Sequence, residues 1–224
     1  MKSLFITGIG TGIGKTLVSA IITRALAADY WKPVQAGYAK GTDSEWIKSQ
    51  TDPDQSNVHP ETYLLKLAAS PHIAARDEDT RIDLEVIEKN FTRIKKVIAV
   101  SKPSETLIIE GAGGLLAPIN EKEFVADLIK VLRTPVILVS RNYLGSINHS
   151  LLTAQVCKHL GLQVAGWIFN DQYLQYEDEI VAWSGFPKIA SIPRSEKLDK
   201  NFINEQSTLL SNSLAEMLST IESE

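Results

Sequence analysis

Apolar and polar positions along the chain fall into two repeating patterns. Short apolar runs, typical of buried strands, predict strands at residues 4–6, 31–36, 107–109, 135–140, 164–169 and 189–192. Longer stretches with apolar residues three and four positions apart predict helices at residues 17–28, 83–100, 124–132, 148–160 and 209–221. Gly161 suits the end of the fourth helix, and the polar residues 51–62 are expected to form a surface loop.

The alternation of strands and helices predicts the fold class. Continuous apolar strands separated by helices indicate a mostly parallel central sheet with helices on both faces. A chain of 224 residues can bury such a core as one α/β domain, which we expect to span residues 1–224. Ligand sites in such sheets gather beyond the carboxyl ends of the strands, so residues that follow a strand are the candidates for function.

A glycine-rich segment joins the first predicted strand to the first predicted helix. It reads Gly8-Ile9-Gly10-Thr11-Gly12-Ile13-Gly14-Lys15-Thr16. Its small residues let consecutive backbone N–H groups surround a phosphate, and the start of the helix adds partial positive charge. In such loops the lysine, here Lys15, reaches the outer phosphates and the Thr16 hydroxyl ligates Mg²⁺. Five residues separate Gly8 from the Gly14-Lys15 pair, whereas the strict P-loop pattern has four. The dinucleotide-binding fingerprint fits this segment less well. The sequence therefore predicts a P-loop NTPase-like fold.

Three charged residues lie at or near other strand ends. Glu110 follows the apolar residues 107–109, where NTPases place an acid that holds Mg²⁺ or its water. Asp43 lies beyond the second strand and is either a further Mg²⁺ ligand or the N-cap of a helix. Lys32 lies in the second strand and is either part of the site or a solvated lysine. The spacing alone does not decide between these alternatives.

Composition and charge argue against several partners. A formal net charge of −4 gives no reason to expect nucleic acid, whose binding proteins carry a basic face. No apolar stretch approaches the roughly 20 residues of a membrane span. The chain runs from Met1 almost directly into a strand, so we expect no signal peptide, and the single cysteine, Cys157, fits a reducing compartment. We therefore expect a cytoplasmic protein with no nucleic-acid or membrane partner.

Six segments of the chain together resemble the dethiobiotin synthetase family, in order between about residues 4 and 194. They are the glycine-rich loop, Lys32-Pro33-Val34-Gln35-Ala36-Gly37, Ser70-Pro71-His72, Glu110-Gly111-Ala112-Gly113-Gly114, Leu144-Gly145-Ser146-Ile147-Asn148-His149, and residues 165–171. The loop and the Glu-Gly-Ala-Gly-Gly segment also occur in related amide-forming ATPases. The combination with Lys-Pro-Val and Gly-x-Ile-Asn-His is much more specific to this family.

The resemblance implies a ring closure in biotin synthesis. In this family the substrates are 7,8-diaminononanoate, CO₂ and ATP, and the cofactor is Mg²⁺. One amine takes up CO₂ to give a carbamate, the γ-phosphoryl group passes to the carbamate oxygen, and the second amine attacks the mixed anhydride. The products are dethiobiotin, ADP and phosphate. Such phosphoryl transfer needs positioning and charge neutralisation more than covalent help.

The resemblance also implies a role for each site residue. Lys15 and Lys32 would hold the γ-phosphate and the carbamate from two sides, and Thr11 would contact both. The implied Mg²⁺ ligands are Thr16, Asp43 and Glu110. The implied nucleotide contacts are Gly12, Ile13, Gly14, Lys15, Thr16, Leu17, Glu110, Gly113, Asn170 and Pro193, the last two near the adenine. The implied substrate contacts are Thr11, Lys32, Ala36, Gly113, Ser146, Ile147 and Asn148.

The resemblance further implies a homodimer whose substrate site is shared between subunits. In the family, the segment that contains Asn148 comes from the partner subunit and holds the substrate carboxylate at a helix N-terminus. Two positions depart from the family pattern. Gly12 stands where the family often has an acidic residue, and Ala36 stands where it often has Ser or Thr. Both departures change hydrogen bonds beside the ligands, but neither position belongs to the set of charged residues that the resemblance places around the phosphates, Lys15, Lys32, Asp43 and Glu110.

Two other kinds of P-loop protein stay open as alternatives. A cobyrinic acid diamide synthase domain usually accompanies a glutaminase with a nucleophilic cysteine, whereas Cys157 lies within a predicted helix. A partitioning or positioning ATPase carries an extra lysine near the start of the loop, and residues 8–13 contain none. Rapid ATP turnover that needs the diamine indicates the synthetase. A response of ATP turnover to a protein, DNA or membrane partner indicates the partitioning or positioning ATPase, which acts as a regulatory switch rather than as a metabolic enzyme.

Overall fold

The sequence predicts a mostly parallel central sheet, and in the structure every pair of neighbouring strands in this sheet is parallel. The computed structural model describes residues 2–101, 106–171 and 174–223, so Met1 and Glu224, the ends of the expected domain, lie outside the described residues. The sheet contains β1 (Lys2–Gly8), β2 (Asp29–Trp31), β4 (Val58–His59), β6 (Thr106–Glu110), β7 (Val136–Arg141), β8 (Val164–Asn170) and β9 (Lys188–Ile192). Their order is β4-β2-β6-β1-β7-β8-β9, and each neighbouring pair is parallel.

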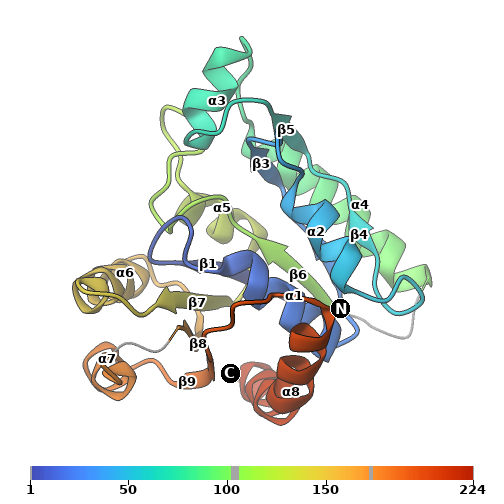
Figure 1. Cartoon of the computed structure of the whole chain (residues 1–224). Coiled ribbons are helices and arrows are strands. Elements are labelled where there is room, and N and C mark those ends of the chain that lie inside the picture. The colour runs from blue at the N-terminus through green and yellow to red at the C-terminus, as the bar shows by residue number, and fades with distance from the viewer. Residues whose placement is uncertain (1, 102–105, 172–173, 224) are drawn as a thin grey trace.

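Helices cover both faces of this sheet, which confirms the predicted α/β architecture (Figure 1). They are α1 (Lys15–Ala25), α2 (Asp43–Gln50), α3 (Pro71–Asp77), α4 (Leu84–Ser101), α5 (Val125–Leu132), α6 (Ser146–His159), α7 (Glu177–Ser184) and α8 (Lys200–Ser223). Helices α4 to α7 share one buried apolar cluster with Phe5, whereas α1, α2 and α8 share another with Leu4 and Ile6. Because successive residues of a strand point to opposite faces, β1 supplies both clusters.

The predicted strand at residues 31–36 is wrong as a single element. β2 ends at Trp31, and β3 (Val34–Ala36) pairs with β5 (Tyr63–Leu65) in a separate two-stranded sheet beside α3 (Figure 1). Pro33 explains the break, since proline has no N–H for a sheet hydrogen bond and restricts the residue before it. The chain therefore changes sheets at Lys32, which leaves this lysine at the end of a central strand.

Other boundaries differ by less. The expected loop at residues 51–62 contains the short edge strand β4, and the last helix begins at Lys200 rather than at residue 209. Gly161 follows the C-cap of α6 with a φ of +64°, which confirms its predicted place at a helix end. Among the described residues, none of the helices is both long and apolar enough to cross a membrane.

A buried carboxylate holds the edge strand β4 to the sheet. Asp29, at the start of β2, is 1% exposed. It accepts hydrogen bonds from the Asn57 backbone N at 2.9 Å and the Asn57 Nδ2 at 3.2 Å, and it contacts His59 Nε2 at 2.9 Å. Burial by itself raises the pKa of Asp29, but these partners outweigh burial and hold the pKa below its ordinary value of 3.8.

The substitution Asp29→Ala is expected to lower the free energy of unfolding at pH 7 by about 2–3 kcal/mol, because it leaves buried donors without an acceptor. Since the folded-state pKa lies below 3.8, the carboxylate stabilises the fold fully above that pH and loses its effect as the pH falls through the folded-state pKa. Urea denaturation followed from pH 7 down to about pH 2, below the folded-state pKa, checks both statements. The exposed Asp54→Ala is the control, expected within about 0.5 kcal/mol of wild type. A pH-independent difference would contradict the role given to the charge.

Candidate active site

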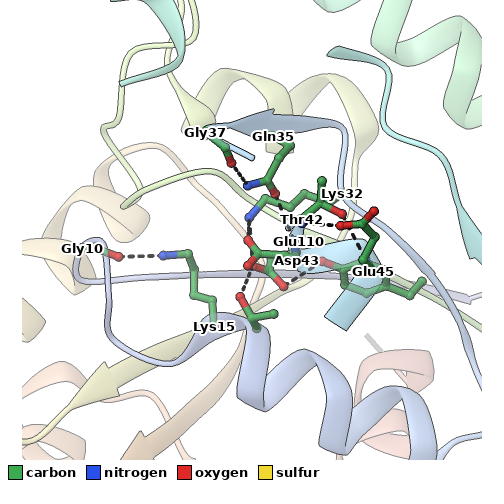
Figure 2. A network of polar contacts seen from close by, with 11 residues as sticks. Gly10, Lys15, Lys32, Gln35, Gly37, Thr42, Asp43, Glu45 and Glu110 are labelled. Atoms are coloured by element: carbon green, nitrogen blue, oxygen red, sulfur yellow. Dashed lines mark hydrogen bonds and ion pairs between the residues drawn. The ribbon is translucent and has the colours of Figure 1, made fainter. Parts of the chain in front are cut away.

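The glycine-rich loop leaves the carboxyl end of β1 and enters α1. Gly12 and Gly14 have φ angles of +71° and +90°, a backbone conformation that favours glycine. Lys15 begins α1, is 7% exposed, and donates from Nζ to the Gly10 carbonyl oxygen at 2.7 Å (Figure 2). Within the described part of the chain, no side chain caps the N-terminus of α1. The loop therefore presents a helix N-terminus and a buried ammonium group, which suit a phosphate.

Glu110 is the centre of a polar cluster beside this loop (Figure 2). It is the last residue of β6, and its side chain is buried. Its Oε1 accepts from Thr16 Oγ1 at 2.9 Å and from Lys32 Nζ at 3.2 Å. Its Oε2 accepts from the Tyr30 hydroxyl at 2.9 Å. Lys32 Nζ also donates to Asp43 Oδ2, so one ammonium group joins two carboxylates.

The structure decides both alternatives that the spacing left open. Lys32 is 6% exposed and forms two ion pairs, so the solvated-lysine interpretation is wrong. Thr42, not Asp43, is the N-cap of α2, in a capping box with Glu45. Asp43 is the first residue of that helix and turns its carboxylate toward Lys32 (Figure 2). The N-cap interpretation of Asp43 is therefore also wrong, and its carboxylate belongs to the polar cluster.

The surroundings shift the pKa values of the two lysines in opposite directions. Burial lowers the pKa of Lys15 to about 8, and the smaller influences of nearby charges partly cancel. Burial also lowers the pKa of Lys32, but the Glu110 and Asp43 carboxylates outweigh it, so this pKa lies above its usual value. Lys32 is thus a firmly charged group between two acids. Lys15 is held by a neutral carbonyl oxygen and gains more from an anionic ligand.

One cavity of about 710 Å³ collects most of the predicted site. The predicted residues that line it are Thr11, Gly12, Gly14, Lys15, Thr16, Leu17, Lys32, Ala36, Asp43, Glu110 and Gly113. They come from the loop, α1, α2 and β3, from the end of β6, and from residues that follow β2 and β6. Trp46 of α2 and Leu198, which precedes α8, add apolar walls that the sequence did not single out. The cavity thus combines hydroxyl, ammonium and carboxylate groups with apolar surface.

Asn170 and Pro193 lie outside the lining of this cavity. Asn170 is the last residue of β8, and its Nδ2 donates to the Ile13 carbonyl oxygen at 2.8 Å. Its Oδ1 is buried and has no hydrogen-bond partner among the described residues. Pro193 directly follows β9 and is exposed. The structure therefore places Asn170 against the loop and leaves one of its acceptors unused.

Ser146, Ile147 and Asn148 form the first turn of α6, and they too lie outside the lining of the cavity. The Ser146 hydroxyl is buried and lies 2.6 Å from the Tyr176 hydroxyl. Asn148 is exposed. Within this single chain, the structure therefore does not bring this helix end together with the rest of the predicted site.

Tyr30 is the residue of the cluster that the sequence analysis missed. It precedes Lys32 by two positions, and both side chains contact Glu110. A strand places residues two positions apart on the same face, so this spacing was the signal that could have found it. It was hidden because an apolar run with an aromatic residue is typical of an ordinary core strand.

Solved structures with a similar fold belong to other P-loop ATPases. The MinD cell division protein of Aquifex aeolicus aligns with a TM-score of 0.60 at 16% identity, over 100% of this chain and 98% of its own. A ParA family ATPase of Chlorobium tepidum aligns with a TM-score of 0.56 at 13% identity, over 96% of this chain and 92% of its own. At such low identity the likeness establishes the P-loop NTPase fold alone.

Sequence relatives are much more similar. A family model described as an AAA domain matches residues 2–201. The ATP-dependent dethiobiotin synthetase BioD of Cytophaga hutchinsonii is 46% identical over 204 residues, which cover 91% of this chain and 94% of that protein. The protein of the same name from Christiangramia forsetii is 38% identical over 217 residues, 96% of this chain and 99% of that protein. The chain therefore belongs to the ATP-dependent dethiobiotin synthetase family and is a ligase of that family.

Proposed function

We propose that the protein closes the ureido ring of dethiobiotin from 7,8-diaminononanoate and CO₂, with ATP hydrolysed to ADP and phosphate and Mg²⁺ as cofactor. The whole chain, residues 1–224, acts as one ligase domain. The observation that carries the proposal is the meeting of Lys15, Lys32, Asp43 and Glu110 at one cavity beside the glycine-rich loop. The relatives named as dethiobiotin synthetases support the choice of substrate.

The cluster has a donor set that suits a magnesium ion. Thr16, Asp43 and Glu110 offer a hydroxyl and two carboxylates, the oxygen donors that Mg²⁺ prefers. The described residues contain no group of three His, Cys, Asp or Glu side chains able to hold a metal by themselves. This fits Mg²⁺, which is commonly bound by one or two carboxylates together with substrate phosphates and water. When bound there, the ion would neutralise charge on the triphosphate.

Two ammonium groups serve the phosphoryl transfer. Lys15 binds the γ-phosphate and the carbamate, and Lys32 stabilises the charge that builds on the carbamate and the transferring phosphoryl group from the opposite side. Charges held in a buried, preorganised site lose little energy to reorganisation during the reaction. Thr11, Ala36 and Gly113 line the same cavity and are the proposed contacts of the substrate.

The adenine is proposed to lie near Asn170 and Pro193. The unused Oδ1 of Asn170 supports this, because a buried acceptor without a partner is costly and an adenine amino group is a donor. Gly12, Ile13, Gly14 and Leu17 complete the proposed nucleotide contacts.

The substrate carboxylate is proposed to bind at the α6 N-terminus of a second subunit. Ser146, Ile147 and Asn148 lie outside the cavity of their own subunit, which supports a role in the neighbouring one. A helix N-terminus favours a carboxylate through its free N–H groups and its dipole. The active form is therefore a homodimer with two shared sites, and its partners are the small-molecule substrates and the second subunit.

Phosphate release is expected to depend on the diamine, bicarbonate and Mg²⁺ together. The reason is that the γ-phosphoryl group has no acceptor in the cavity beside Lys15 and Lys32 until the diamine and CO₂ have formed a carbamate there. ATP hydrolysis measured with each component left out in turn, with mass detection of dethiobiotin, tests this. Equal hydrolysis with and without the diamine would reject the proposed function in favour of a switch ATPase.

Mixing two inactive variants is expected to restore activity. A Lys15→Ala chain keeps a normal α6 N-terminus, and an Asn148→Ala chain keeps a normal loop, so each mixed dimer holds one intact site. Random mixing gives about a quarter of wild-type activity in a symmetric dimer. The control is a mixture of Lys15→Ala with Lys32→Ala, whose defects lie in the same half of the site and leave none intact. No recovery in the first mixture, or an active monomer in sedimentation, contradicts the shared site.

A further inference from the structure

The side chain of Tyr30 lies in the apolar core, and its hydroxyl reaches the polar cluster around Glu110. Its side chain is 0% exposed and belongs to the apolar cluster shared with α1, α2 and α8. Its hydroxyl donates to Glu110 Oε2 at 2.9 Å. The backbone of Tyr30 pairs with Ile108 of β6 on one side and with Val58 of β4 on the other. The phenol is therefore held by a strand that has neighbours on both sides.

The two oxygens of Glu110 have separate partners. Oε1 accepts from Thr16 of α1 and from Lys32, which directly follows β2. Among the described residues, Tyr30 is the partner of Oε2. This division fixes the rotation of the carboxylate, because turning it would remove Oε2 from its donor. A bond to a charged acceptor in a buried place is among the stronger hydrogen bonds of proteins.

The direction of this hydrogen bond is also fixed. An ionised carboxylate can only accept a hydrogen bond, so the Tyr30 hydroxyl is the donor to Glu110 Oε2. A neutral hydroxyl adds no negative charge to a cluster that already contains the Glu110 and Asp43 carboxylates.

We propose that Tyr30 is a positioning residue, whose hydroxyl holds Glu110 so that Oε1 stays turned toward Thr16 and Lys32. This inference rests on the proposed role of Glu110 at the Mg²⁺ site. Without the hydroxyl, Oε2 becomes a buried charged oxygen that lacks its donor. The carboxylate is then stabilised by a rotation that brings Oε2 toward Lys32, and this rotation moves Oε1 away from Thr16. Tyr30 itself touches neither the nucleotide nor the substrate cavity, whose lining does not include it.

The test is Tyr30→Phe, which removes one oxygen and keeps the ring in the core. The matched control is Tyr63→Phe on β5, which also removes one hydroxyl, an acceptor for the Asp83 backbone N at 3.1 Å. The first readout is calorimetric binding of a non-hydrolysable ATP analogue, with Mg²⁺ and with EDTA. The second is the separation of kcat from the KM values.

Tyr30→Phe is expected to bind the analogue in EDTA like wild type and to lose about tenfold affinity in Mg²⁺, with kcat about tenfold lower, as for one hydrogen bond to a charged group. Tyr63→Phe is expected to match wild type in all of these. In a Glu110→Gln background, Tyr30→Phe is expected to have no further effect on Mg²⁺-dependent binding, because the residue acts through Glu110.

Two results would overturn the inference while leaving the proposed function intact. One is unchanged Mg²⁺-dependent binding in Tyr30→Phe. The other is an equal loss with and without Mg²⁺, which indicates general damage to the fold. A wild-type protein whose analogue binding does not respond to Mg²⁺ would instead reject the proposed Mg²⁺ site, and the inference with it.

Discussion

Replacement of Lys32 by alanine is expected to lower kcat about 100- to 1,000-fold, the usual cost of one lost donor to transition-state charge. The affinity for ATP is expected to change by less than about threefold, because a group that acts mainly in the transition state contributes little to ground-state binding. The structure supports this separation, since Lys32 Nζ is bound by Glu110 and Asp43 rather than by the glycine-rich loop. Steady-state kinetics and calorimetric binding of an ATP analogue give the two quantities.

Lys15 provides the contrast for this experiment. Its ammonium group lies at the loop, so Lys15→Ala is expected to weaken nucleotide binding and turnover together. Lys48→Ala is the control for Lys32→Ala, because Lys48 is an exposed lysine on α2, the helix that begins with Asp43. Near-normal turnover in Lys32→Ala would contradict a catalytic role and leave Lys32 as a counter-charge for the buried Glu110 and the partly exposed Asp43.

The long parallel strands could be predicted from sequence because their apolar runs are continuous. Residues buried on both faces leave no polar alternation, so β6 and β7 stand out against the helices on either side. The short elements could not be predicted in this way. β4 and β5 have two and three residues, and α3 has seven, which is too few for a period to be recognised. α2 is short and mostly polar, and it depends on its capping box and its packing.

The candidate site was predictable where a motif is continuous in sequence. The loop and the segment after β6 carry their own signals, and the parallel sheet brings both to one edge. The contact between Lys32 and Asp43 was not predictable, since it depends on how the chain leaves β2 at Pro33 and where α2 then lies. The contact between Tyr30 and Glu110 depends in the same way on which strands are neighbours, which no single segment encodes.

The second large effect is expected on the affinity for ATP when glycines of the glycine-rich loop are replaced by alanine. Three of these glycines distinguish the effect of backbone strain from that of a steric collision. Gly10 has no positive φ, and a Cβ there meets open space. Gly12 has a φ of +71° and equally open surroundings. Gly14 has a φ of +90°, and a Cβ there collides with the Asn170 side chain. Alanine at Gly10 therefore adds neither strain nor a collision. Alanine at Gly12 adds backbone strain alone, and alanine at Gly14 adds both.

The affinity for ATP is expected to fall in that order. Gly10→Ala should bind within about threefold of wild type, well under the tenfold step of about 1.4 kcal/mol. The reason is that a Cβ at this position causes neither backbone strain nor a collision. Gly12→Ala should lose about tenfold in affinity, since a non-glycine residue in the left-handed conformation costs roughly 1–3 kcal/mol. In the free variant the loop relaxes out of this conformation, and the nucleotide must bring it back when it binds. Gly14→Ala should lose about 100-fold or more, because the collision also pushes Asn170 away from its hydrogen bond to Ile13.

Calorimetric titration of the three variants with an ATP analogue measures these differences, and thermal unfolding without ligand separates loop strain from a general loss of stability. Gly14→Ala joined to Asn170→Ala removes the collision and keeps the strain, so its unfolding temperature should rise above that of Gly14→Ala alone. If Gly10→Ala binds as poorly as Gly14→Ala, the close approach of the phosphates controls affinity rather than the backbone conformation of the loop. The proposed link between the loop and Asn170 would then be wrong.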